Sequence, residues 1–145
     1  MIPAEMAALH ALCFSAPPPW PAAEFASLLE HPLVFSLNEA EAFLIGRAVA
    51  GQAELLTLAV APQARRRGLG ARLVQRFLYQ ARLRGAEEAF LEVAAPNLSA
   101  RALYVHAGFA EAGLRRGYYR SPGDSPVDAV VMRRSLGPFP VPQAG

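Results

Sequence analysis

The sequence contains no lysine, because all 14 of its basic residues are arginine. This absence excludes a P-loop, whose phosphate-binding signature requires a lysine followed by serine or threonine. Cys13 is the only cysteine, so no disulfide can form within the chain, and its apolar neighbours favour a buried position. The three histidines are far apart in the sequence and lack the spacing of metal ligands, so we expect no metal site.

Long apolar runs and a strong net charge are lacking as well. Arg47 and Glu54 interrupt the most apolar stretch before it reaches the roughly 18 residues that a membrane-spanning helix needs. The N-terminus carries Glu5 and no basic flank, so it does not resemble a signal peptide. A formal charge of +2 is too small to indicate a nucleic-acid-binding protein. We therefore expect a cytoplasmic protein, monomeric or weakly dimeric, without a membrane or direct nucleic-acid partner.

The composition is that of a folded globular protein, with 53% hydrophobic and 18% charged residues in a chain of 145. We expect one domain over residues 1–136 and a flexible, proline-rich tail over 137–145. Hydrophobic periodicity predicts helices at 3–14, 22–31, 69–84 and 97–107. It predicts strands at 34–37, 42–48, 54–61, 89–93, 109–116 and 127–133, with turns around Asn38-Glu39 and Gly51-Gln52. The predicted fold class is therefore mixed α/β (α+β), with one sheet packed against helices.

Residues 65–70, Arg-Arg-Arg-Gly-Leu-Gly, stand between an apolar strand and the start of an amphipathic helix. Glycine lets the backbone approach a ligand closely, and the first turn of a helix offers unpaired N–H groups and the positive end of its dipole. Leu73 stands where a dinucleotide-binding fingerprint needs its third glycine. The segment therefore predicts a site for a phosphorylated cofactor of another kind. The alternative is an exposed, arginine-rich turn before an ordinary helix.

A second candidate region joins a strand to the helix predicted over 97–107. Asn97 suits the N-cap of that helix, and Tyr104 lies two turns later on the same face. Glu92 lies on the preceding strand between apolar neighbours. A carboxylate and a phenol could supply the proton acceptor and donor that acyl transfer from a thioester to an amine needs. Alternatively, Glu92 is only a carboxylate at a sheet edge, Tyr104 packs its ring, and Asn97 is purely a cap.

The motifs Leu91-Glu92-Val93, Ala102-Leu103-Tyr104, Arg115-Arg116-Gly117-Tyr118-Tyr119 and Asp128-Ala129-Val130-Val131-Met132 follow the glycine-rich turn in order. From about residue 54 to 132 the chain resembles the ribosomal-protein-alanine N-acetyltransferase (RimI-type) branch of the GNAT superfamily. The resemblance implies a mostly antiparallel central sheet with one splayed parallel strand pair and helices on both faces. It implies an N-alpha-acetyltransferase that moves acetyl from acetyl-CoA to the N-terminal alanine of a small-subunit ribosomal protein.

The resemblance also implies residue roles, with Glu92 as general base and Tyr104 as general acid. The acceptor would be a protein N-terminal peptide, ribosomal in origin, and acetyl-CoA the co-substrate, without a metal. Residues implied to bind the acceptor are Trp20, Glu54, Tyr118 and Tyr119. Residues implied to bind acetyl-CoA are Leu58, Ala59, Val60, Arg66, Arg67, Gly68, Leu69, Gly70, Ala71 and Asn97.

Several alternatives stay open on the sequence. Glu54 is a rival base, and Trp20, Tyr118 and Tyr119 could serve packing alone. The acceptor could be another protein N-terminus, a lysine or a small-molecule amine, or the chain could be a non-catalytic acyl-CoA-binding module. The chain also departs from the family pattern. Ala94 and Pro96 stand where arginine and serine are usual, and the first helix begins so early that the usual first strand is expected to be short or missing.

Overall fold

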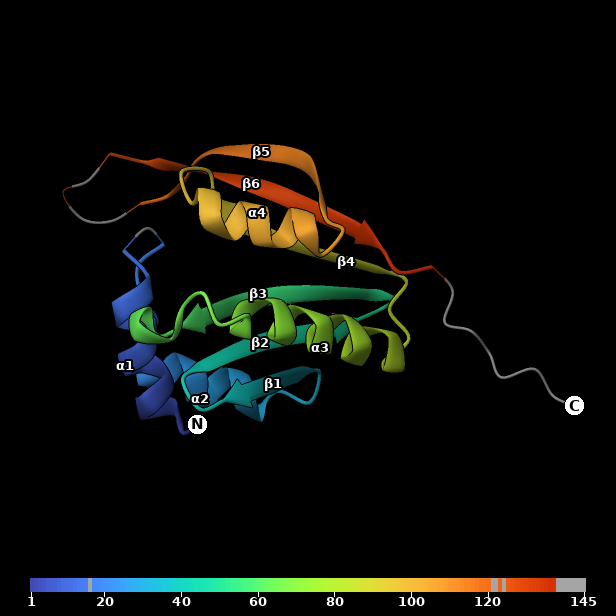
Figure 1. Cartoon of the computed structure of the whole chain (residues 1–145). Helices are drawn as coiled ribbons and strands as arrows, with labels where there is room; N and C mark the ends of the chain where they lie inside the picture. Colours follow the sequence, from blue (N-terminus) through green and yellow to red (C-terminus); the bar gives the residue numbers. More distant parts are fainter. Residues whose placement is uncertain (16, 121–122, 124, 138–145) are drawn as a thin grey trace, which may run out of the picture.

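The computed structural model describes residues 1–15, 17–120, 123 and 125–137. They form one six-stranded sheet in the order β1-β2-β3-β4-β6-β5, with helices on both faces (Figure 1). The helices are α1 (Pro3–Cys13), α2 (Ala22–Glu30), α3 (Leu69–Leu83) and α4 (Leu98–His106), with a short 3-10 helix at Pro62–Ala64. The strands are β1 (Val34–Glu39), β2 (Ala42–Val49), β3 (Gln52–Val60), β4 (Glu88–Ala94), β5 (Ala110–Tyr119) and β6 (Val127–Ser135). The predicted mixed α/β class is confirmed, whereas the predicted tail, apart from Gly137, lies outside the described residues.

Every predicted helix and strand has a counterpart, but both predicted turns were misplaced. Asn38 and Glu39 belong to β1, where they pair with Phe43 and Ala42, so the turn falls at residues 40–41. The buried pairing of β1 with β2 extends as far as a two-residue connection permits, which draws these polar residues into the strand. The second turn is Ala50-Gly51, because residue 52 already belongs to β3, where it pairs with Val49 of β2. In the described N-terminal residues, α1 is preceded by no strand, as expected.

Two apolar clusters hold the helices to opposite faces of the sheet. On one face α3 and α4 pack over the sheet, and the buried stripe of α3 is Leu73, Val74, Phe77, Leu78 and Ala81. On the other face α1 and α2 pack through Met6, Leu9 and Phe25 onto Phe43 and Ile45. This arrangement confirms the predicted helices on both faces (Figure 1). Within the described residues, no helix is long and apolar enough to cross a membrane.

The parallel strands β3 and β4 separate partway along their length. Their pairing begins at Gln52 opposite Glu88 and ends at Leu55 opposite Leu91. At the same place β3 has a bulge, because Gly46 pairs with Leu55 and Ile45 with Thr57, which leaves residue 56 unopposed. Beyond it β4 continues its pairing only with β6. The predicted splayed parallel pair is therefore confirmed, and the bulge supplies its physical reason.

Candidate active site

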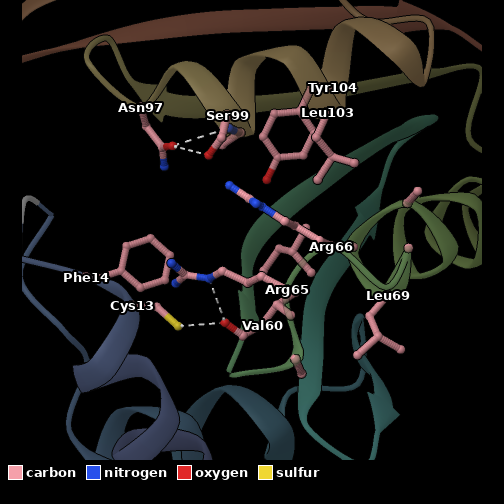
Figure 2. A pocket seen from close by; sticks show the side chains of 16 residues that line it. Cys13, Phe14, Val60, Arg65, Arg66, Leu69, Asn97, Ser99, Leu103 and Tyr104 are labelled. Atoms are coloured by element: carbon pink, nitrogen blue, oxygen red, sulfur yellow. Dashed lines mark hydrogen bonds between the residues drawn. The ribbon is translucent and has the colours of Figure 1, made fainter. Parts of the chain in front are cut away.

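A cavity of about 680 Å³ opens between the end of β3, the start of α3, the N-terminal turns of α4 and the end of α1 (Figure 2). We call it the glycine-loop cavity, because the Arg65–Ala71 segment supplies much of its wall. Its wall is lined by most of the residues that the sequence assigned to cofactor binding, and by Tyr104, the predicted general acid. These are Leu58, Val60, Arg66, Gly68, Leu69, Gly70, Ala71, Asn97 and Tyr104.

The loop backbone has a shape that depends on glycine. Gly68 has a φ of +76° and directly precedes α3, whose N-terminus receives no side-chain cap. Arg66 also has a positive φ, +67°, which is uncommon for a residue with a side chain. A Cβ on Gly70 would lie 3.2 Å from Cδ2 of Leu103 and would narrow the cavity. The loop thus leaves backbone N–H groups at a helix N-terminus open to an anion.

The arginines near the loop differ in what they contact. Arg66 extends into the cavity toward α4 (Figure 2), and no ion pair engages it among the described residues. Arg65 donates from Nε to the carbonyl oxygen of Val60, at 3.2 Å. The exposed Arg67 lies 3.5 Å from a carboxylate oxygen of Glu41 and does not line the cavity. Among the described residues, Arg66 and Arg65 both bring a guanidinium without an ion pair to this cavity, and Arg65 already donates one hydrogen bond to the backbone.

Ala59, the other assigned residue outside the lining, has its side chain in the α1–α2 cluster. Its predicted role concerned the backbone alone, so that role stays a prediction.

Asn97 and Tyr104 lie on α4 where the helix borders the cavity. The side-chain oxygen of Asn97 accepts a hydrogen bond from the Ala100 N–H at 3.2 Å, which confirms the predicted N-cap. Tyr104 is only 6% exposed. Burial, and to a lesser extent the neighbouring Tyr119, raises the pKa of the Tyr104 phenol. Tyr104 therefore remains protonated at neutral pH and can act as a donor.

A second cavity, of about 580 Å³, adjoins the first. We call it the carboxylate cavity, because Glu54 and Glu92 both line it. It also contains the other residues assigned to the acceptor, Trp20, Tyr118 and Tyr119. The two cavities share the lining residues Cys13, Phe14, Leu58, Asn97, Ala100 and Tyr104. A ligand in one cavity can therefore reach a ligand in the other beside the phenol of Tyr104.

Each carboxylate of this cavity has an arginine partner. Glu92 Oε1 lies 3.2 Å from Nε of Arg115, and Glu54 accepts a hydrogen bond of 2.7 Å from Arg47. The negative charge of Glu92, then burial and a hydrogen bond to Glu92, raise the pKa of Tyr118. Burial first and the charge of Glu92 second raise the pKa of Tyr119. Two phenols that stay protonated at neutral pH thus stand beside the carboxylate of Glu92.

His10 is the main residue of the site that the sequence did not reveal. It is 1% exposed, and its Nδ1 accepts from the Trp20 N–H at 3.0 Å. Its Nε2 must therefore carry the proton and donate to Thr57 Oγ1, at 2.9 Å. Burial lowers the pKa of His10 to about 4, so the ring is neutral at pH 7. The signal was its helical spacing with Met6 and Leu9, which placed it on the inner face of α1.

The expected burial of Cys13 was wrong in part. It is half-buried, not fully buried, because the last turn of α1 ends at the rim of both cavities. Its thiol donates to the carbonyl oxygen of Val60 at 3.3 Å (Figure 2). Across the described residues, no group of three or more His, Cys, Asp or Glu side chains is placed to hold a metal ion.

Known proteins with similar sequences are acetyltransferases. Residues 6–109 match the acetyltransferase (GNAT) family. A ribosomal protein bS18-alanine N-acetyltransferase of Escherichia coli strain K12 is 39% identical over 118 residues, which cover 79% of each chain. The N-alpha-acetyltransferase RimI of Mycobacterium tuberculosis is 36% identical over 140 residues, covering 90% of this chain and 85% of that protein.

A solved structure agrees. The crystal structure of the ribosomal-protein-S18-alanine N-acetyltransferase from Escherichia coli matches with a TM-score of 0.81 and 31% identity, over 99% of this chain and 90% of that one. These relatives confirm the predicted resemblance to the RimI-type branch. With its splayed sheet and the family match over most of its length, the chain belongs to the acetyltransferase (GNAT) family.

Proposed function

We propose that this protein transfers the acetyl group of acetyl-CoA to the α-amine of a protein N-terminus, with the N-terminal alanine of a small-subunit ribosomal protein as its acceptor. The observation that carries the proposal is the junction of the two cavities at Tyr104, with a cofactor-sized cavity on one side and Glu92 on the other. The names of the relatives support this acceptor.

The glycine-loop cavity fits acetyl-CoA. The first turn of α3 and the Arg66 guanidinium suit the negatively charged pyrophosphate. The separated end of β3, at Leu58–Val60, has no partner in β4, so this edge of the strand can offer backbone groups to the pantetheine arm. The carbonyl oxygen of Val60 is already occupied, because it accepts from Arg65 and from Cys13. Asn97, on the opposite wall, would hold the same arm. In this arrangement acetyl-CoA supplies an activated thioester.

The choice of an α-amine follows from its pKa. An N-terminal ammonium has a pKa of about 7.7–8.0, so deprotonation at pH 7 costs about 1 kcal/mol, against roughly 4–5 kcal/mol for a lysine of pKa about 10.4. A carboxylate such as Glu92 can accept that proton, directly or through a water. The neutral amine then attacks the acetyl carbon, the carbon–sulfur bond breaks, and the nitrogen gives up a second proton to become the amide; this second proton balances the one that the departing sulfur gains. Glu54 lines the same cavity and is the alternative base.

Tyr104 would supply the proton that the departing sulfur gains. Its raised pKa keeps the phenol protonated until the carbon–sulfur bond breaks. Transfer to a thiolate of ordinary pKa, about 8.5, would be uphill. However, the burial that raises the pKa of Tyr104 also raises that of a thiol beside it, which brings the two closer to balance. The phenol would recover its proton from the acceptor side of the site.

The test is an acceptor panel assayed by release of free thiol from acetyl-CoA. It compares a peptide with a free N-terminal alanine, an N-blocked peptide containing lysine, and a polyamine. We expect the alanine peptide to have the highest kcat/KM. Equal or higher activity on the lysine peptide would contradict the α-amine assignment. Binding of acetyl-CoA without thiol release for any acceptor would identify a non-catalytic module.

A further inference from the structure

The edge strand β5 contains a wide bulge beside the carboxylate cavity. Arg115 pairs with Ala129 and Tyr119 pairs with Val127, so three residues of β5 stand opposite one residue of β6, Asp128. Within the bulge Gly117 has a φ of +59°, a conformation that residues with a Cβ rarely adopt. The bulge therefore favours glycine at its centre, and the N–H that leaves the ladder needs another partner.

Asp128 supplies that partner. Its Oδ1 accepts a hydrogen bond from the Gly117 N–H at 2.8 Å. Its main-chain oxygen accepts from the Ala95 N–H, also at 2.8 Å, on the turn that leads to Asn97. One residue thus fastens β5 on one side and the turn before α4 on the other. The side-chain bond is charge-assisted, which makes it stronger than a bond between neutral groups.

The bulge has a direct consequence for the cavity. In a regular strand, consecutive side chains point to opposite faces of the sheet. Tyr118 and Tyr119 are consecutive, yet both line the carboxylate cavity, with ring centroids 5.1 Å apart. Arg115, at the start of the bulge, lies over the Tyr118 ring and pairs with Glu92. The tyrosine pair beside Glu92 therefore depends on the irregular backbone of β5.

We propose that Asp128 is a positioning residue for the acceptor: by holding the bulge at Gly117, its carboxylate places Tyr118 and Tyr119 as one wall of the acceptor pocket beside Glu92. The inference rests on the proposed function, because it takes the carboxylate cavity to be the acceptor pocket. Asp128 itself does not line either cavity and acts through the two tyrosines.

The experiment compares Asp128→Ala with Asp128→Asn in steady-state kinetics on the alanine peptide. Asparagine keeps an oxygen that can accept from the Gly117 N–H, whereas alanine keeps none. We expect Asp128→Ala to lower kcat/KM for the peptide about tenfold or more, as for loss of a hydrogen bond to a charged group, mainly through a higher peptide KM. We expect Asp128→Asn to restore kcat/KM to within about threefold of wild type, because only the charge assistance is lost. The KM for acetyl-CoA should change less than about twofold, since the glycine-loop cavity is untouched.

Two further variants keep the test decisive. Glu111→Ala removes an exposed carboxylate of β5 that pairs with Arg101 outside both cavities, and should leave the peptide KM unchanged. Gly117→Ala disturbs the bulge from β5 and not from β6. It should raise the peptide KM as Asp128→Ala does, and it serves as the test if Asp128→Ala does not fold. The inference is overturned if either bulge variant keeps the wild-type peptide KM, if alanine and asparagine at 128 behave alike, or if the acetyl-CoA KM rises equally. Inactivity of the wild-type protein on the peptide would instead overturn the proposed function.

Discussion

The glycine-loop cavity and the carboxylate cavity adjoin, but they are built in different ways. The first takes more than half of its lining from one stretch of chain, residues 58–71, and depends on the path of the backbone through Gly68 and Gly70. The second collects side chains from α1, the loop after it, β3, β4, α4, β5 and β6. A site built from backbone should tolerate substitutions that leave the path of the backbone unchanged, but not those that fill its space. A site built from converging side chains should instead be sensitive to the loss of single side chains.

Glu92→Gln tests the carboxylate cavity where we expect the largest effect. Loss of a general base lowers kcat by roughly 10²–10⁴-fold, and the amide cannot accept the proton of the ammonium. The dissociation constant of acetyl-CoA should not change, because Glu92 does not line the glycine-loop cavity. The measurements are steady-state thiol release and calorimetric titration with acetyl-CoA.

The matched control is Glu54→Gln, because Glu54 is the other carboxylate of the same cavity. It should lower kcat much less than Glu92→Gln. If Glu54→Gln abolishes turnover while Glu92→Gln stays active, the roles of the two residues are reversed, although the contrast between the cavities survives.

The stability of the folded protein should depend on pH because of His10, a buried residue that lines the carboxylate cavity. The folded-state pKa of His10 is about 4, below the ordinary value of 6.5, so between these values the unfolded chain binds more protons than the folded one. The free energy of unfolding therefore rises with pH over this window, and the contribution of His10 is complete above about pH 7. Acidification from pH 7 to 4 should cost up to about 3 kcal/mol through this residue. Urea unfolding at several pH values measures the slope.

His10→Gln removes the titration while keeping a donor and an acceptor, so its slope between pH 4 and 6.5 should be smaller than that of the wild type. His31→Gln is the control, since His31 is exposed. An unchanged slope in His10→Gln would show that the acid sensitivity has another origin.

Gly70→Val tests whether the glycine-loop cavity depends on backbone shape. A Cβ at this position meets Leu103 at 3.2 Å, and the extra methyl groups fill space intended for the ligand. If a clash of about 1–3 kcal/mol opposes binding, the acetyl-CoA KM should rise about fivefold to 150-fold. The peptide KM should stay near its wild-type value. Gly85→Ala, at a φ of +83° beyond the other end of α3, should lower stability by about 1–2 kcal/mol without changing either KM.

We expect the smallest effect on the acetyl-CoA KM from the loop arginines, and we expect it to differ between the neighbours Arg66 and Arg67. Arg66→Ala removes a guanidinium that lines the cavity and should raise the acetyl-CoA KM about two- to fivefold, as for a partly exposed ion pair. Arg67→Ala removes an exposed side chain already paired with Glu41 and should change it less than twofold. Equal effects of the two substitutions would mean that the loop acts through its overall positive charge alone.

Much of the fold could be predicted because its elements carry local signals. The stripe of α3 and its flanking glycines, the Asn97 cap and the alternation of the strands are all properties of neighbouring residues. The turn at 40–41 could not be placed, because the length of β1 is set by its pairing with β2 and not by its own polarity.

The candidate site divides in the same manner. The strand, turn and helix of the glycine loop are continuous in sequence, so the lining around Gly68 and Gly70 could be predicted. The different contacts of Arg66 and Arg67 could not, because Arg67 pairs with Glu41, which lies far away in the sequence, whereas Arg66 lines the cavity. The burial of His10 against Thr57 joins residues 47 positions apart and leaves no local trace beyond a helical spacing.

The sequence by itself determined the strand–glycine turn–helix unit and the separate strand and helix that carry Glu92 and Tyr104, because hydrophobic periodicity and the special conformations of glycine act over a few residues. Only the tertiary structure decided that Glu92 and Tyr104 line adjoining parts of one site and that Tyr118 and Tyr119 share a wall. Those placements arise from a bulge in β3, a bulge in β5 and the pairing of strands far apart in the chain. Contacts of that kind form only when the whole sheet is assembled.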